Sequence, residues 1–136
     1  MPTLEEIQKK FAADHFATQA AGCEIRLAEP GHSLCAMVLE SRHCNAVGML
    51  QGGAIFTLAD FAFAVAVNAF SDYATVSLQH SITFLAPARG KTLLAEARCV
   101  RSGRSTCYYT VSITDDLGNS VAQMTVNGFV TGKKIS

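Results

Sequence analysis

The sequence predicts an α+β fold in which antiparallel strands surround one buried helix. Residues 53–70 form an apolar segment of helical length, and Asp60 is its only charged residue. A helix that is apolar on every side is expected to lie in the protein core. From residue 76 onward, apolar and alternating runs separated by turn residues indicate four strands. The 136 residues have the length of one domain with a single core, so we assign residues 1–136 to one domain.

The N-terminal segment, residues 1–22, is expected to begin with a helix. Thr3 and Glu6 have the spacing of a capping box, in which each side chain bonds the backbone N–H of the other residue. Leu4, Ile7 and Phe11 then recur at helical spacing, so this helix should extend to about residue 13. Residues 14–22 fit either a loop or a second helical turn.

Two strands, at residues 23–28 and 33–39, are expected to flank a turn at Pro30-Gly31. Residues 40–50 then form a loop. The glycine-rich end of this loop leads into the central helix, which should extend from about Gly52 to Phe70.

The strand expected at residues 76–84 alternates between apolar and polar side chains. One face would carry Val76, Leu78, His80, Ile82 and Phe84, and the other would carry Ser77, Gln79, Ser81 and Thr83. His80 is therefore interpreted as a core histidine with satisfied hydrogen bonds rather than as a catalyst. Further strands are expected at residues 93–100, 106–114 and 121–130, with turns at 102–104 and 116–119.

The composition narrows the classes of function. The formal net charge is +0, and charged residues make up 16% of the chain against 49% for hydrophobic residues. These values argue against bulk attraction to nucleic acid or acidic membranes, and they favour burial of apolar surface in an oligomer. Residues 53–70 are long enough to resemble a membrane span. However, a charge at the centre of a span costs roughly 2.5–3.5 kcal/mol, so Asp60 argues against membrane insertion.

Compartment and metal content can also be inferred. The N-terminus lacks the basic and apolar regions of a signal peptide. The five cysteines form neither a Cys-x-x-Cys pair nor a Cys/His pattern with metal-ligand spacing. We therefore expect a reduced, cytoplasmic protein without a metal site.

Asp60 is the residue that most needs an explanation, because burying a carboxylate costs several kcal/mol unless it is paired or used. A structural role in a cap or an ion pair is one interpretation. The Gly52-Gly53 helix start supports a functional one, because free N–H groups at a helix N-terminus bind anions and oxyanions. Eight residues of helix span roughly 12 Å, which is too far for both groups to act on one atom. A second, antiparallel copy of the helix would bring Asp60 opposite Gly52, so the spacing favours a two-fold dimer.

The residues around this helix also resemble a known family signature. The pattern is Asn45-x-x-Gly48-x-x-Gln51-Gly52-Gly53-x-x-x-x-Leu58-x-Asp60, followed by Val76-Ser77, Phe84-Leu85-x-Pro87-Ala88-Arg89-Gly90 and the turn Gly103-Arg104-Ser105. It is similar to that of the phenylacetate-pathway (PaaI-type) acyl-CoA thioesterases. Their fold is the hotdog fold, a curved antiparallel sheet wrapped around a long central helix.

The resemblance implies a set of roles. Asp60 would be the general base or the nucleophile, and the Gly52 N–H would bind the thioester carbonyl oxygen. Asn45 and Ser77 would position water. The site would lie at a dimer interface, and dimers would pair further into a tetramer. No cofactor is implied, because the coenzyme A (CoA) thioester is the substrate.

The resemblance also implies a CoA site. Arg89 and Arg104 occupy the matching turns and would bind the CoA phosphates, together with Gly53; Lys91 and Arg101 also lie near strand ends. Phenylalanines of the helix, Phe56, Phe61 and Phe63, would surround the acyl group or simply fill the core.

Two residues do not fit directly into the roles that the family resemblance implies. Gln51 stands where the family commonly has His, and an amide can donate a hydrogen bond but cannot shuttle a proton at neutral pH. Gln51 would then either polarise the thioester or bond the turn backbone. Ser77 falls on the polar face of its strand, so it would need a bulge or a strand end to reach the site.

Two rival functions exist for this fold. A hotdog dehydratase or hydratase works with a His and a carboxylate, and the missing His at Gln51 argues against it. A non-catalytic acyl-CoA-binding or regulatory protein would be expected to lack the helix carboxylate, and Asp60 is present.

Overall fold

The computed structural model describes residues 1–135 and has the expected α+β architecture. Its elements are α1 (Leu4–Phe11), the π-helical turn η1 (Phe16–Ala20), β1 (Cys23–Glu29), β2 (His32–Val38), the 3-10 turn η2 (Ser41–His43), α2 (Gly52–Asn68), β3 (Tyr73–Phe84), β4 (Thr92–Ser102), β5 (Thr106–Asp115) and β6 (Ser120–Lys134).

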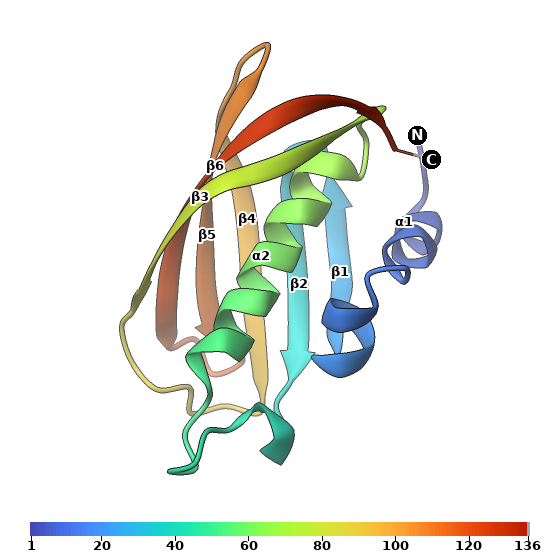
Figure 1. The fold of residues 1–136 in the computed structure, drawn as a ribbon. Helices are drawn as coiled ribbons and strands as arrows, with labels where there is room; N and C mark the ends of the chain where they lie inside the picture. The colour runs from blue at the N-terminus through green and yellow to red at the C-terminus, as the bar shows by residue number, and fades with distance from the viewer. Residues whose placement is uncertain (136) are drawn as a thin grey trace.

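The six strands form one antiparallel sheet in the order β1-β2-β4-β5-β6-β3. The sheet curves around α2, which crosses its concave face (Figure 1). The buried core lies between them and contains aliphatic, aromatic and small side chains, with Leu58 and Val65 of α2 fully covered. This arrangement of a curved sheet around a central helix confirms the predicted fold.

The N-terminal helix has the predicted start. Both hydrogen bonds of the Thr3–Glu6 capping box are present, and the Thr3 side chain accepts from the Glu6 N–H at 3.2 Å. Ile7 is buried and anchors α1 against β1. Of the two alternatives for residues 14–22, the helical one is confirmed, because residues 16–20 form a short π-helical turn.

The predicted alternation of β3 is wrong for its first half. The pairing of β3 with β6 shifts register between Ser77 and Gln79, so the strand carries a bulge there. Val76 and Leu78 are consequently 46% and 65% exposed instead of core-facing. Thr75 is buried, and Ser77, two residues further on, falls on the same side of the strand.

Helix α2 is not buried on every side within the single chain, which corrects the expectation from its composition. Ile55, Leu58, Phe61 and Val65 are buried against the sheet. The opposite side is only partly covered and consists of Phe56, Thr57, Asp60, Ala64 and Val67. Within residues 1–135, no helix has the length and apolar character needed to cross a membrane.

Candidate active site

The loop before α2 is shaped by Asn45. Its side-chain oxygen accepts hydrogen bonds from the N–H groups of Val47 and Met49, at 3.0 and 3.1 Å. Its backbone N–H donates to the Met49 carbonyl at 2.7 Å, and Gly48 at the loop tip has a φ of 81°, which favours glycine. Asn45 therefore organises the loop with its oxygen, which leaves its amide nitrogen as the group that could meet a ligand.

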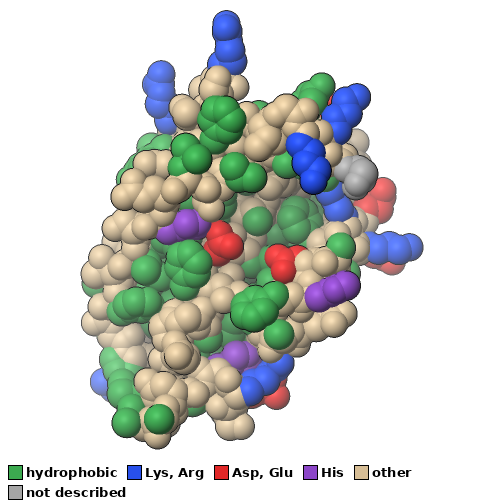
Figure 2. Space-filling model, viewed as in Figure 1, with side chains coloured by type: hydrophobic (Ala, Val, Ile, Leu, Met, Phe, Trp, Pro, Cys, Tyr) green, Lys and Arg blue, Asp and Glu red, His purple; other side chains and the backbone are tan. Residues whose placement is uncertain are grey.

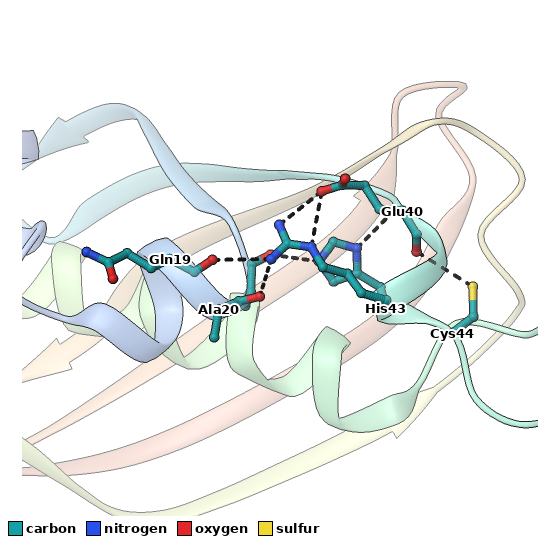
Figure 3. A network of polar contacts seen from close by, with 7 residues as sticks. Gln19, Ala20, Glu40, His43 and Cys44 are labelled. Carbon is teal, nitrogen blue, oxygen red and sulfur yellow. Dashed lines mark hydrogen bonds and ion pairs between the residues drawn. The ribbon is translucent and has the colours of Figure 1, made fainter.

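A polar network anchors this loop to the N-terminal segment (Figure 3). The Arg42 guanidinium donates to the Glu40 carboxylate at 2.9 Å and to the carbonyl groups of Gln19 and Ala20. The buried His43 accepts from the Glu40 N–H at its Nδ1, and its Nε2 donates to the Ala21 carbonyl at 2.7 Å. These hydrogen bonds therefore hold residues 40–43 in place where the chain leads into the loop before α2.

Gln51 is the N-cap of α2. Its side-chain oxygen accepts from the Gly53 N–H at 2.8 Å, so the interpretation that it bonds the turn backbone is confirmed. The Gly52 N–H has no acceptor among residues 1–135 and is free to donate. A Cβ at Gly52 would lie 3.1 Å from Cζ of Phe84, so only glycine fits this position without pressing on that ring.

A cavity of about 740 Å³ opens beside Gly52. It lies between the loop before α2 and the chain after β3, and its lining is mainly apolar, with Met49, Leu50, Ile55 and Phe84 among the lining residues. A free N–H at the edge of an apolar cavity is the arrangement expected for a group that receives a carbonyl oxygen.

Buried Asp115 stabilises the chain around Gly90, which lines the far wall of this cavity. Its carboxylate accepts from the Arg89 and Gly90 N–H groups, at 2.8 and 3.1 Å, and from the Asn119 side chain at 2.9 Å. These hydrogen bonds, led by that of Asn119, hold the pKa of Asp115 well below its usual range. Sequence analysis missed Asp115, because nothing in a single Asp beside a turn indicates that five donors converge on it.

Asp60 on α2 contacts His80 of β3. His80 Nε2 lies 3.3 Å from Asp60 Oδ1, and the side chains are 15% and 47% exposed, respectively. Partial burial raises the pKa of the Asp60 carboxyl, the His80 ring lowers it, and the carboxylate of Asp14 raises it further. His80 Nδ1 is buried without a hydrogen-bond partner among the described residues, which corrects the expectation of a fully satisfied core histidine.

A smaller cavity, of about 240 Å³, adjoins Asp60. Its lining includes Asp14, Phe16, Phe56 and Phe61, so two of the three helix phenylalanines expected near an acyl group contribute to it. The third, Phe63, instead packs edge-on against Tyr109, with ring centroids 5.2 Å apart. Figure 2 shows acidic side chains among apolar ones over this face, with Lys and Arg gathered around its rim.

The structure brings some predicted residues together and separates others. Gly52 and Asp60 lie on one continuous helix, so the expected separation of roughly 12 Å between them stands. Ser77 pairs with Gly128, where a Cβ would lie 3.2 Å from Phe63 of α2. Because directly paired residues share a face of the sheet, the bulge places Ser77 on the helix side.

The two arginines expected to bind CoA lie at opposite ends of β4. Arg89 precedes the strand and Arg104 follows it, which separates them by roughly 35 Å within one chain. They could approach the same ligand only if a second chain supplied one of them.

The sequence matches the Thioesterase superfamily over residues 47–122. Human acyl-coenzyme A thioesterase 13 is 32% identical over 125 residues, 89% of each chain, and Escherichia coli acyl-coenzyme A thioesterase PaaI is 31% identical over 121 residues, 85% of this chain and 86% of that one. Another relative, from Archaeoglobus fulgidus, is 36% identical over 93 residues, and the match spans 60% of its length.

Solved structures give the same result. The structure of Escherichia coli PaaI superimposes with a TM-score of 0.84 at 27% identity, covering 98% of this chain and 100% of that one. A hypothetical thioesterase from Streptococcus pneumoniae, solved with coenzyme A, superimposes with a TM-score of 0.81 at 31% identity over 90% of this chain and 98% of that one. The chain therefore belongs to the thioesterase superfamily, with the PaaI-type hotdog fold.

Proposed function

We propose that this protein is an acyl-CoA thioesterase that hydrolyses its substrate to a free acid and CoA. The observation that carries the proposal is the free Gly52 N–H at the start of α2, on the edge of an apolar cavity. The half-exposed Asp60 carboxylate on the same helix supplies the second group that such a reaction needs. Relatives named as acyl-CoA thioesterases, and the related structure that contains coenzyme A, support the choice of substrate.

The proposed active site is shared between two subunits. The thioester carbonyl oxygen accepts from the Gly52 N–H of one subunit, where the N-terminus of α2 stabilises the negative charge that develops on that oxygen. Asp60 of the partner subunit faces the carbonyl carbon, because the distance along α2 is too long for one chain to supply both groups. The two-fold dimer, which could pair into a tetramer, thus follows from the chemistry proposed.

Asp60 acts in its ionised form, either by attacking the thioester carbon or by taking a proton from the water that attacks it. The amide nitrogen of Asn45 and the hydroxyl of Ser77, on the helix side of β3, position that water. We assign Gln51 the structural role of capping α2 with its oxygen, rather than a role in polarising the thioester. The reaction needs no cofactor or metal, since a thioester is already an activated acyl group.

The CoA and acyl portions are assigned to different surfaces. Arg89 of one subunit and Arg104 of its partner bind the phosphates, since a two-fold dimer brings opposite ends of the two sheets together. Gly53, at the start of α2, is assigned to the same CoA site. The acyl group enters the cavity beside Asp60, where Phe56 and Phe61 provide an aromatic lining.

The decisive experiment measures release of the CoA thiol from a panel of aryl- and alkyl-acyl-CoAs. Wild type should turn over at least one of them, and Asp60→Asn should lower kcat by about 100-fold or more. Asp72→Asn, which neutralises an exposed carboxylate beyond the end of α2, is the matched control and should have wild-type activity.

Two results would contradict the proposal. Binding of acyl-CoA by wild type without turnover would favour a non-catalytic acyl-CoA-binding protein. Hydration of an enoyl-CoA without release of thiol would favour the hydratase function. Native mass spectrometry of each variant establishes whether it still assembles, so that a loss of activity is not confused with a loss of the dimer.

A further inference from the structure

His80 is the titratable group whose position the proposed reaction does not explain. It comes from β3, opposite Val126 of β6, and extends toward α2 with its Nε2 3.3 Å from Asp60 Oδ1. Its ring lies beside two phenylalanines of α2, with centroids 4.9 Å from Phe56 and 6.2 Å from Phe63, both edge-on. The imidazole is therefore held on an apolar wall with only its Nε2 directed at a polar group.

The burial of Nδ1 determines which tautomer of the His80 ring is favoured at this position. Nδ1 is covered and has no hydrogen-bond partner among residues 1–135. A proton on Nδ1 would be a buried donor without an acceptor, and it would leave Nε2 as a lone pair facing the Asp60 carboxylate, which is repulsive. The neutral tautomer with a proton on Nε2 avoids both costs and donates a hydrogen bond to Asp60.

We propose that His80 is a positioning residue that donates its Nε2–H to Asp60 Oδ1 and thereby directs the other carboxylate oxygen at the thioester. This inference rests on the thioesterase function proposed above. A carboxylate on a half-exposed helix side can otherwise rotate about its side-chain torsions. A single fixed donor removes that freedom and stabilises the ionised form that the reaction uses.

The groups that face Asp60 set the direction of the expected pH effect. Among the described residues they are His80 from β3 and Asp14 from the chain between α1 and η1. His80 lowers the pKa of Asp60, through its charge when the ring is protonated and through its Nε2–H bond when the ring is neutral, whereas the Asp14 carboxylate raises it. Replacing His80 by an apolar residue removes the lowering contribution and leaves the raising ones. The pKa of Asp60 then rises, a smaller fraction is ionised at a given pH, and the acid limb of the rate profile moves to higher pH.

The test compares His80→Leu and His80→Gln with wild type in steady-state thiol release across the pH range. His80→Leu should lower kcat on the order of tenfold or more in the acid limb, with little change in KM, and should shift that limb to higher pH. His80→Gln keeps an N–H donor that does not titrate, so it should recover most of the lost kcat. Because Leu also removes the unpaired buried Nδ1, the Tm of His80→Leu should equal or exceed that of wild type.

His32 provides the matched control. It forms another histidine–carboxylate pair, with its Nε2 2.7 Å from Glu96 Oε2, and its side chain is similarly covered at 19% exposure. His32→Leu should leave the pH profile unchanged. An equal shift from His32→Leu, or none from His80→Leu, would overturn the inference while leaving wild-type turnover intact. Absence of turnover in wild type would instead refute the function proposed.

A second measurement does not depend on activity or on the folding of a variant. Long-range ¹H–¹⁵N NMR spectra of the wild-type protein report which ring nitrogen of His80 carries the proton. The expected result is a protonated Nε2 and a bare Nδ1. A proton on Nδ1 would overturn the inference.

Discussion

Replacing Gly52 with proline removes a backbone N–H without removing a hydrogen bond of the fold. The Gly52 N–H has no acceptor among residues 1–135, and Gly52 is the first residue of α2, where proline is favoured. The preceding residue must be extended to tolerate proline, and Gln51 already is, with φ −67° and ψ 131°. The backbone φ of Gly52 also lies outside the left-handed region. The substitution therefore isolates the chemical role of the donor.

The expected loss follows from that role. Removing one oxyanion-hole donor costs about 10²–10³ in kcat, or about 2.7–4 kcal/mol of transition-state stabilisation. Because the N–H interacts more strongly with a developing oxyanion than with a neutral carbonyl, most of the loss should appear in kcat and little in KM. The assay is steady-state thiol release at saturating acyl-CoA, with circular dichroism melts to verify folding.

Gly52→Ala is the control, because it adds a Cβ at the same place but keeps the N–H. That Cβ would approach Phe84 Cζ to 3.1 Å in both variants, so crowding by the Cβ is common to them. Gly52→Ala should stay far more active than Gly52→Pro. Equal activities would assign the loss to the side chain and refute the role of the Gly52 N–H.

Three further predictions concern assembly, the cap and the far wall of the cavity. Asp60→Asn and Gly52→Pro should each be inactive alone. When the two variants are co-expressed, about a quarter of wild-type activity should return, because half of the dimers are mixed and each mixed dimer has one intact site of two. No recovery would place both groups in one chain. Gln51→Ala should destabilise the fold by about 1 kcal/mol through loss of the N-cap, measured by denaturant unfolding, while leaving kcat essentially unchanged. Asp115→Asn should lower Tm at neutral pH. Since the pKa of Asp115 is lowered on folding, its contribution to stability is complete above the unfolded-chain pKa of about 3.9 and is lost as the pH falls below it, so the difference in Tm should shrink in acid.

The parts of the fold that the sequence predicted are those that local chemistry determines. The Thr3–Glu6 capping box depends on neighbouring residues alone, and the turn at Gly31, with its φ of 71°, is predictable from the glycine itself. The start of α2 at Gly52 was likewise predictable from the glycines and from Gln51, which the structure identifies as the cap. The loop before α2 was recognised through the resemblance of its Asn45-to-Gly53 pattern to a family signature, and the hydrogen bonds by which Asn45 organises the loop were not predicted.

The predictions that proved wrong concern residues whose position depends on pairing with a strand far away in the sequence. Alternation along β3 assigned Val76 and Leu78 to the core, but the bulge is set by pairing with β6, where Gly128 lets Phe63 approach the sheet. The same bulge returns Ser77 to the helix side, which alternation alone excluded. His80 was placed on the correct face, yet its contact with Asp60 joins β3 to α2 and no spacing within either segment reveals it.

The half-exposed side of α2 links the fold to the proposed chemistry. A globular chain of this size can cover a helix completely, but here Ala64 and Val67 remain partly open beside the Asp60 carboxylate. Small side chains on an open helix face allow a second backbone to approach closely, and apolar ones gain free energy when they are covered. A carboxylate in that position is costly to cover, because a partner that packs on this face without pairing the charge would bury it. It becomes useful when the covering partner brings the N-terminus of its own α2, whose positive end stabilises the ionised carboxylate and whose Gly52 N–H completes the site. Assembly and catalysis would then depend on the same side of one helix.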